Sequence, residues 1–311
     1  MSPRRSAFFD IGTNTILCLI ADTRDTGRFR VLDDLAEITR LGEGVDRTGL
    51  ISPDAERRSF EVLERYRDHC DNLGVQEIIA VGTSAFREAK NSSAVRARIH
   101  DKLGIDVRVI SGDEEAAYSF LATQRGLSLV GNELLVVDIG GGSTELVHGN
   151  QSGVLQGVSL DLGSVWLTER FLHSDPVCKA EVDLMGEAIE RQLSSLAAHG
   201  MRVNSLVTLV GIAGTFTTLA AIEKKLERYS HSQIHGEILT VDAVRRQCQL
   251  LQEKTIAERK RIVGLEPKRA DVIFAGAYLL ERIMALWQID KVIVSNQGVR
   301  YGLLYETAKP I

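Results

Sequence analysis

Short apolar runs separated by turn residues open the chain. The segments AFFDIG, ILCLIAD and RFRVLDD, within residues 7–34, have the length and composition of β-strands, with turn residues at 12–14 and 25–27 between them. Over residues 52–72 the apolar residues recur instead at helical spacing, with Ser52 suited to be the N-cap and Pro53 to be the first helical residue. The pattern predicts an antiparallel meander of three strands followed by a helix.

The same plan then appears a second time. The first half continues with predicted strands at 77–82 and 107–110 and predicted helices at 94–104 and 113–126. The second half contains three strand-like runs within 133–163, helices at 163–172 and 178–199, a strand and a helix within 205–226, helices at 241–262 and 270–287, a strand at 290–296 and a helix at 297–306. We therefore predict two α/β domains, residues 1–125 and 126–311, with the last helix (about 298–311) able to pack back on the first domain.

The composition excludes several classes of protein. With 311 residues, of which 44% are apolar, the chain can fill two hydrophobic cores, and its formal charge of −5 gives no sign of a nucleic-acid or membrane partner. The four cysteines form no Cys-x-x-Cys pair, which argues against a zinc site and against a disulfide framework. No apolar stretch approaches the roughly 18 residues of a membrane span. We expect a cytoplasmic protein that binds neither nucleic acid nor membranes.

A glycine-rich turn after an apolar run is the first candidate site. The stretch VVDIGGGSTELVHG (136–149) has a weaker copy, FFDIGTNTILCLIAD (8–22), at the matching position of the first half. Consecutive glycines, which have no side chain, let backbone N–H groups converge on an anion, and the hydroxyls of short side chains can contact phosphate oxygens. The candidate phosphate-binding residues are Gly12, Thr13, Asn14 and Thr15 in the first loop and Gly140, Gly141, Gly142, Ser143 and Thr144 in the second.

Each of the two loops follows an aspartate. Asp10 and Asp138 stand at equivalent positions, and a carboxylate among phosphates requires a cation between them, so both are candidate Mg²⁺ ligands. The alternative is that each D-I-G is an aspartate-based turn without a ligand. We favour the ligand-binding interpretation because the tripeptide occurs at matching positions of a duplicated plan.

A third loop resembles the first two in composition. The segment VGIAGTFTTL (210–219) leads from a strand into glycine, threonine and a helix N-terminus, and it adds Gly211, Gly214 and Thr215 as candidate phosphate-binding residues. Alone this loop is weak evidence. The chain contains no Walker loop, and no Rossmann fingerprint follows the first strand.

Together these stretches resemble the exopolyphosphatase and guanosine pentaphosphate phosphohydrolase (Ppx/GppA) family. The matching stretches, in order, are DIGTNT, RLGEGVDRTGLIS, VGTSAFREAKN, VISGDEEAAYSFLA, VVDIGGGSTELVHG, SLDLGSVWLTERF, LVGIAGTFTTLAAI, GLEPKRADVIFAGAYLLE and VSNQGVRYGLL. The resemblance implies two actin-like (ribonuclease H-like) domains of the acetate and sugar kinase, Hsp70 and actin superfamily, a cleft between them, phosphoanhydride hydrolysis and a homodimer. Many members carry a C-terminal HD-like extension, so we expect a short form, and its processivity on long polyphosphate stays open.

The resemblance also assigns roles to two glutamates. Glu115 in SGDEEA matches the catalytic glutamate, which would orient or deprotonate the attacking water. Glu145 matches the second active-site glutamate, which could share the water or the metal. Without the resemblance, we would interpret Glu115 as an acidic residue that complements the positive end of a helix dipole. Glu145 would then be a solvent-exposed residue of a strand.

Three arginines match the pattern of the family. The resemblance implies that Arg87 matches an arginine that contacts phosphate, and a guanidinium fork fits two phosphoryl oxygens. Arg269 and Arg300 match as well, and for these two we weigh substrate contact evenly against structural ion pairing, for instance of Arg269 with Asp271.

Four functions are consistent with such a site, and we rank them. The first is a Mg²⁺-dependent exopolyphosphatase. The second is hydrolysis of guanosine pentaphosphate (pppGpp), which needs a guanine pocket; the aromatic content of 5% leaves few platforms for stacking a base. A kinase of the same superfamily is disfavoured by the SGDEEA and SAFREA motifs, and a sensor that binds polyphosphate or (p)ppGpp without turnover is disfavoured by the intact glutamates.

Overall fold

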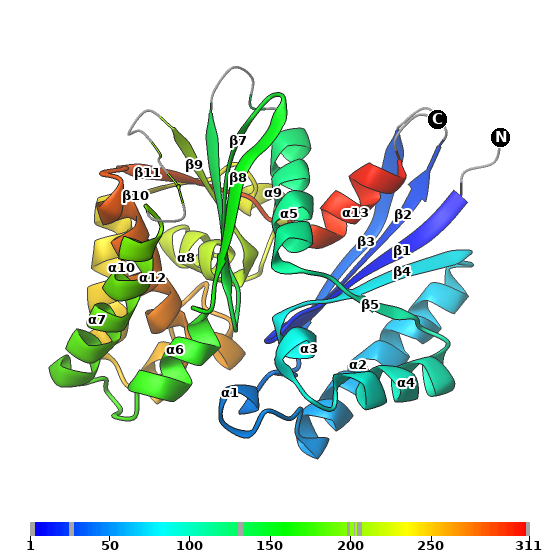
Figure 1. The fold of residues 1–311 in the computed structure, drawn as a ribbon, viewed down its shortest axis with the longest axis horizontal. Coiled ribbons are helices and arrows are strands. Elements are labelled where there is room, and N and C mark those ends of the chain that lie inside the picture. The colour runs from blue at the N-terminus through cyan, green and yellow to red at the C-terminus, as the bar shows by residue number, and fades with distance from the viewer. Residues whose placement is uncertain are drawn as a thin grey trace. The chain divides into compact units, whose positions relative to one another are not determined.

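The computed structural model describes residues 4–24, 28–127, 129, 133–197, 200–201, 203 and 207–308 (Figure 1). It divides into two compact units: unit 1 is Met1–Ala122 with Val299–Ile311, and unit 2 is Thr123–Gly298. The chain leaves unit 1 within helix α5 (Gly112–Gly126) and returns to it at helix α13 (Val299–Thr307). Both units are α/β, as the sequence predicts.

Unit 1 is built on a five-stranded sheet. Its strands are β1 (Arg4–Ile11), β2 (Thr15–Thr23), β3 (Phe29–Ile38), β4 (Glu77–Gly82) and β5 (Val107–Val109), in the order β3-β2-β1-β4-β5. The first three strands form the expected antiparallel meander, and β4 and β5 add in parallel to β1. The remaining helices of the unit are α1 (Val45–Thr48), α2 (Pro53–Asn72), α3 (Ser84–Glu88) and α4 (Ser92–Leu103).

Helices cover both faces of this sheet (Figure 1). On one face the core joins strand residues such as Phe9 to Leu63 of α2, and on the other it joins Phe8 to Leu303 of α13. Consecutive strand residues therefore serve opposite faces, as the alternation of side chains in a strand requires. The face under α13 is completed by the last part of the chain.

Helix α2 begins where the sequence predicts. The Ser52 side chain accepts a hydrogen bond of 3.2 Å from the N–H of Ala55, and Pro53 occupies the first helical position, where its missing N–H costs nothing. The cap fixes the helix register, and with it the side of the helix that faces the sheet.

Unit 2 repeats the plan with an addition. Its strands are β6 (Leu134–Ile139), β7 (Thr144–Asn150), β8 (Gly153–Leu160), β9 (Thr208–Ile212), β10 (Ile238–Thr240) and β11 (Lys291–Val294), in the order β10-β11-β9-β6-β7-β8. Read from β8, this is the order of unit 1 with β10 added antiparallel at the edge. The helices are α6 (Ser164–Phe171), α7 (Lys179–Ser195), α8 (Ala213–Glu223), α9 (His231–Ile234), α10 (Val241–Glu253), α11 (Ile256–Arg259), the 3₁₀ helix η1 (Pro267–Arg269) and α12 (Ile273–Leu286).

One predicted helix is two. Residues 241–262 divide into α10 and α11, because Thr255 caps a new helix: its hydroxyl accepts from the N–H of Glu258, whose carboxylate accepts from the N–H of Thr255 at 2.9 Å. The predicted turn at 25–27 and the end of the predicted helix 178–199 lie outside the described residues. No helix in the described part of the chain has both the length and the apolarity to cross a membrane.

Candidate active site

The two D-I-G loops make the same turn. The N–H of Gly12 donates to the carbonyl of Thr15 at 3.0 Å, and the N–H of Gly140 donates to that of Ser143 at 3.0 Å. They differ beside the aspartate: Asp10 pairs across the strands with Leu17, whereas Asp138 pairs with Glu145. The loops are therefore equivalent in backbone but not in side-chain chemistry.

In the first loop the carbonyls are held on one side. Thr13 O accepts from the N–H of Gly42 at 2.9 Å, and Asn14 O accepts from the N–H groups of Thr39 and Arg40, each at 3.0 Å. A trans peptide is planar, with its N–H opposite its C=O, so the N–H of Asn14 points away from residue 42. This is the orientation that an anion site needs.

The second loop is held in the same way by a helix. Gly140 O accepts from the N–H of Ser164 at 2.9 Å, and Gly141 O accepts from Val165 at 2.9 Å, where α6 begins. The same planarity turns the N–H groups of Gly141 and Gly142 to the other side. Two adjacent amides aimed together form a nest for phosphate oxygens.

The side chain of Asn14 is buried without a partner. Asn14 is 6% exposed, and neither its Nδ2 nor its Oδ1 has a hydrogen-bond partner among the described residues. A buried amide without partners is costly, and such groups in native proteins require an explanation. A phosphate oxygen at the Nδ2 would supply one.

Charged residues of unit 1 converge at the carboxyl end of β1. Arg87 of α3 donates from Nη1 to Glu115 Oε2 at 2.6 Å and to the carbonyl of Ile110 at 3.2 Å. Burial raises the pKa of Glu115, and the charge and hydrogen bond of Arg87 oppose this rise. Burial and then the charge of Glu115 raise the pKa of Asp10 to about 7, against the opposing charge of Arg300. The carboxyl ends of parallel strands are where α/β sheets bind ligands.

Arg300 has a partner that the sequence did not indicate. It is 5% exposed and donates to both carboxylate oxygens of Asp34, at 2.7 and 2.9 Å, while the Tyr301 hydroxyl donates to Asp34 at 3.0 Å. Of the two roles considered for Arg300, structural ion pairing is therefore present within unit 1, with Asp34 as the partner. No motif pointed to Asp34, since it lies 266 positions from Arg300.

In unit 2, Asp138 and Glu145 form a candidate metal site. They face each other across β6 and β7, they are 9% and 1% exposed, and Ser159, another residue that the sequence did not indicate, donates to Glu145 Oε1 at 2.8 Å. Two facing carboxylates suit Mg²⁺, which binds through one or two carboxylates together with water and phosphate oxygens. Within the described residues no group of three or more His, Cys, Asp or Glu side chains could hold a metal. The donor set therefore fits Mg²⁺ and needs ligands from solvent or substrate.

Arg269 lies directly on the third glycine loop. A Cβ at Gly214 would lie 2.1 Å from Nη1 of Arg269, so the guanidinium rests on the bare Cα. Ala213, which opens α8, has a φ of 67°, and Thr215 Oγ1 donates to the carbonyl of Ile139, just before the second loop. Gly211 lies within β9 against the Phe216 ring. Gly214, Thr215 and Arg269 are thus brought together, and Gly211 has a packing role.

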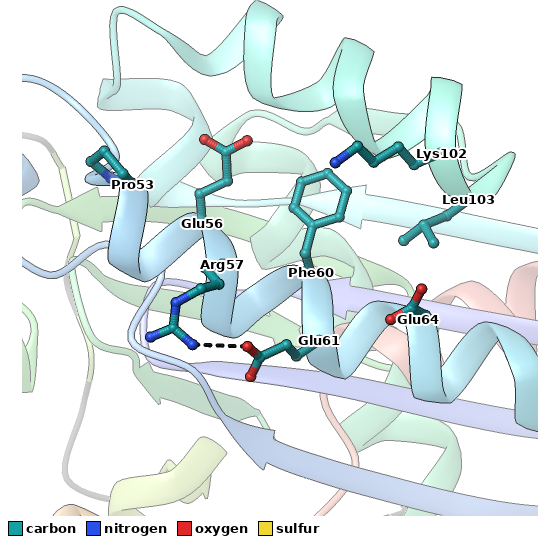
Figure 2. Close-up of a pocket in the computed structure, with 8 residues that line it drawn as sticks. All are labelled: Pro53, Glu56, Arg57, Phe60, Glu61, Glu64, Lys102 and Leu103. Carbon is teal, nitrogen blue, oxygen red and sulfur yellow. Dashed lines mark hydrogen bonds and ion pairs between the residues drawn. The ribbon is translucent and has the colours of Figure 1, made fainter.

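The groove drawn in Figure 2 is separate from these residues. It has a volume of about 430 Å³ and lies between α2 and α4, with Glu56, Phe60 and Lys102 among its lining residues. None of the candidate site residues lines it.

Comparisons with known proteins show which proteins this chain is similar to. The model of the Ppx/GppA phosphatase family matches residues 19–310. Exopolyphosphatase 2 of Mycobacterium tuberculosis is 34% identical over 320 residues, which cover 99% of this chain and 100% of that relative. The crystal structure of an exopolyphosphatase from Cytophaga hutchinsonii is similar with a TM-score of 0.90 at 30% identity, covering 98% of each chain. The guanosine-5'-triphosphate,3'-diphosphate pyrophosphatase of Vibrio atlanticus is 29% identical over 311 residues, which cover 98% of this chain and 60% of that relative.

Proposed function

Because this chain belongs to the Ppx/GppA phosphatase family and is a phosphoanhydride hydrolase, we propose that its substrate is inorganic polyphosphate, from which it releases the terminal phosphate. The similarity over the full length of an exopolyphosphatase supports this substrate. The observation that carries the mechanism is the ion pair between Arg87 and Glu115 at 2.6 Å.

Glu115 is the proposed general base. A water attacks the terminal phosphorus, the bond from that phosphorus to the bridging oxygen breaks, and the water gives a proton to Glu115. Burial favours this role because it raises the pKa of Glu115, which makes the carboxylate a better proton acceptor. Arg87 is the proposed contact to the phosphoryl oxygens, where its charge offsets the charge that develops during the reaction.

The glycine loops are proposed to hold the rest of the phosphate chain. Their contribution is the set of amides turned outward by the pinned carbonyls, together with the short hydroxyls at Thr13, Thr15 and Ser143. The hydroxyls of Thr144 and Thr215 donate to the carbonyls of Leu162 and Ile139 instead. Arg269, on Gly214, adds a guanidinium. These groups recognise phosphate and not a base, which accords with polyphosphate.

We also propose Mg²⁺ as the cofactor, a homodimer as the assembly and the cytoplasm as the location. Asp138 and Glu145 would hold the ion, and Asp10 is the corresponding carboxylate of unit 1. When bound, Mg²⁺ would neutralise charge on the phosphate oxygens. The family resemblance supports the homodimer, the facing carboxylates of Asp138 and Glu145 support Mg²⁺, and the four free cysteines support a reducing compartment.

The alternative substrate is pppGpp. The similarity to the Vibrio atlanticus enzyme supports it, at a lower identity than the similarity to the exopolyphosphatase. A sensor without turnover is the remaining alternative, which the partly buried pair of Arg87 and Glu115 disfavours because its residues suit catalysis.

The test is release of phosphate from long polyphosphate, tripolyphosphate, pppGpp and ATP with Mg²⁺, for the wild type, Glu115→Gln and Glu114→Gln. Glu114 is a matched control, because it precedes Glu115 but is exposed and pairs with Arg108. We expect release from polyphosphate, lost by a factor of about 10²–10⁴ in Glu115→Gln and retained in Glu114→Gln. Preference for pppGpp would favour the alternative substrate, and no release from any compound would favour the sensor.

A further inference from the structure

We propose that Arg58 is a positioning residue for the first phosphate loop, residues 12–15, and that it acts through the segment after β3, residues 39–43, called here the clamp segment. The inference rests on the proposed function, which assigns the loop to phosphate. Arg58 lies in the second turn of α2, outside the glycine loops and the family motifs.

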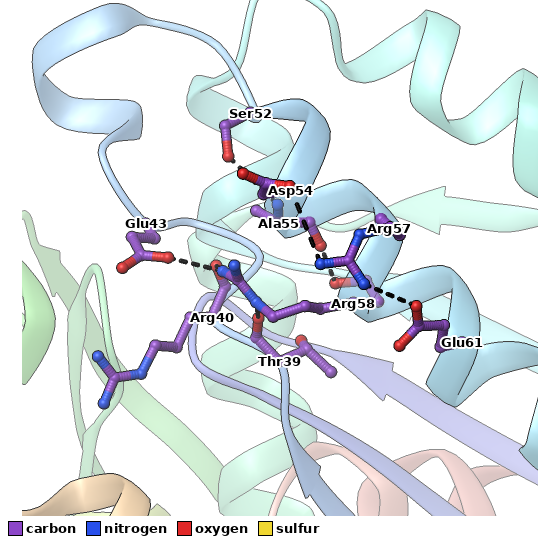
Figure 3. A network of polar contacts seen from close by, with 10 residues as sticks. Thr39, Arg40, Glu43, Ser52, Asp54, Ala55, Arg57, Arg58 and Glu61 are labelled. Carbon is purple, nitrogen blue, oxygen red and sulfur yellow. Dashed lines mark hydrogen bonds and ion pairs between the residues drawn. The ribbon is translucent and has the colours of Figure 1, made fainter.

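Arg58 holds the clamp segment from the side of the helix (Figure 3). Its Nε donates to the carbonyl of Thr39 at 2.8 Å, and its Nη2 donates to Glu43 Oε2 at 2.6 Å and lies 3.4 Å from the carbonyl of Arg40. The rigid fork of one guanidinium thus ties both ends of the clamp segment to α2.

The clamp segment in turn holds the phosphate loop. The N–H groups of Thr39 and Arg40 donate to Asn14 O, and the N–H of Gly42 donates to Thr13 O. These two carbonyls fix the direction of the loop amides, because N–H and C=O lie opposite each other in a planar peptide. From Arg58 to the loop there are only two hydrogen-bonded steps.

Two features show that the clamp segment adopts a demanding conformation. Arg40 has a φ of 54°, in the left-handed region that residues with a Cβ seldom adopt. At Gly42 a Cβ would lie 2.3 Å from Thr13 Cγ2, so the segment can approach the loop only with glycine there. Backbone strain persists only where the surroundings fix it, and the contacts of Arg58 with the carbonyls of residues 39 and 40 supply that restraint.

The preceding arginine offers a matched control. Arg57 donates to Glu61 at 2.8 Å and lies 3.9 Å from Asp54, and all three residues belong to α2 (Figure 3). Removing Arg57 therefore deletes the same charge one position away. The contacts that the structure records for Arg57 are to residues of α2 and not to the clamp segment.

The first measurement is backbone hydrogen exchange of the ligand-free protein for the wild type, Arg58→Ala and Arg57→Ala. We expect faster exchange at Thr39, Arg40 and Gly42 in Arg58→Ala alone, because their N–H groups lose the restraint that keeps them bonded to Asn14 and Thr13. Unchanged exchange in Arg58→Ala would overturn the proposal.

The second measurement is the kinetics of phosphate release from polyphosphate. We expect Arg58→Ala to raise KM about tenfold with little change in kcat, because the loop amides bind phosphate alike in the ground state and the transition state. A purely structural role would lower the folded fraction, and therefore the apparent kcat, without changing KM. Arg58→Lys should lie between the wild type and Arg58→Ala, since an ammonium lacks the planar fork.

The two measurements separate this proposal from the proposed function. If the wild type releases no phosphate from polyphosphate, the proposed function fails, and hydrogen exchange still decides whether Arg58 orders the clamp segment. If the wild type is active and Arg58→Ala keeps the wild-type KM, the proposed function stands and the positioning role of Arg58 is refuted.

Discussion

Arg87 and Glu115 form an ion pair in the structure, with 2.6 Å between Arg87 Nη1 and Glu115 Oε2. The proposed phosphate ligand is thus also the group that opposes the rise in the pKa of the proposed base. A phosphoryl group that binds Arg87 competes with Glu115 for the guanidinium, and it thereby couples substrate binding to the basicity of the carboxylate.

We predict that Arg87→Gln moves the acidic limb of the profile of kcat/KM against pH to higher pH. Without the opposing charge of Arg87, burial raises the pKa of Glu115 further. A higher pH is then needed to ionise the carboxyl group that acts as the base. The profile is measured with polyphosphate, with Arg98→Gln as a control for an exposed arginine paired with Glu56. An unshifted limb in Arg87→Gln would count against Glu115 as the base.

We predict that Asp10→Asn removes a pH dependence of stability. The folded-state pKa of Asp10, about 7, exceeds its ordinary value of 3.8, so the folded protein retains a proton that the unfolded chain loses. Wild-type stability should therefore fall as pH rises from about 4 to about 7, and the variant should gain on the order of 2–4 kcal/mol over the wild type at pH 8. Urea unfolding with a chelator present measures this difference, and parallel curves for the two proteins would contradict the prediction.

We predict that Gly214→Ala weakens binding of polyphosphate more than it weakens the fold. The new Cβ would meet the guanidinium of Arg269, which is the movable end of a flexible side chain, so the cost falls on the position of that charge. The expected outcome is a KM raised by roughly tenfold with a melting temperature close to that of the wild type. Gly74→Ala serves as a comparison for backbone strain, because Gly74 has a φ of 67° and no neighbouring atom within 4 Å of its Cβ position. An unchanged KM in Gly214→Ala would remove Arg269 from the proposed site.

We predict that breaking the pair of Asp34 and Arg300 destabilises the protein by about 3–5 kcal/mol, because one buried charge is left without its partner. The double variant Asp34→Leu with Arg300→Met should recover part of this loss, since it leaves no charge behind. Urea unfolding of Asp34→Asn, Arg300→Met and the double variant provides the comparison. A loss no larger than that of the exposed pair Arg57 and Glu61, about 0.5 kcal/mol, would show that the buried pair carries little stability.

Local signals explain why much of the fold could be predicted from the sequence. Ser52 and Pro53 are adjacent, and they begin α2 where the pattern indicates. Strand β4 coincides with the apolar run at 77–82. The break at Thr255 was missed because a capping box of four residues, Thr255 to Glu258, competed with an apolar period that continues across it. The three-residue β10 exists only by pairing with β11.

Residues of the candidate site could be proposed from the sequence where their chemistry is local. The D-I-G loops, the SGDEEA glutamates and Arg87 each belong to a contiguous motif. Asp34 and Arg58 do not, because each acquires its role from a partner that only the tertiary structure supplies: Arg300 in α13 for Asp34, and the carbonyl of Thr39 for Arg58. Conformations such as the left-handed backbone at Arg40 are likewise imposed by the surroundings rather than by residue type.

The return of α13 to unit 1 has a consequence for the growing chain on the ribosome. Asp34 emerges 266 residues before Arg300, an interval of roughly 13–50 s at the usual rates of synthesis. During that time the first sheet lacks the helix that covers Phe8 and the guanidinium that neutralises Asp34. Unit 1, whose strands are synthesised first, is therefore completed only once α13 has left the ribosome, and until then the sheet face that carries Phe8 lacks its helical cover.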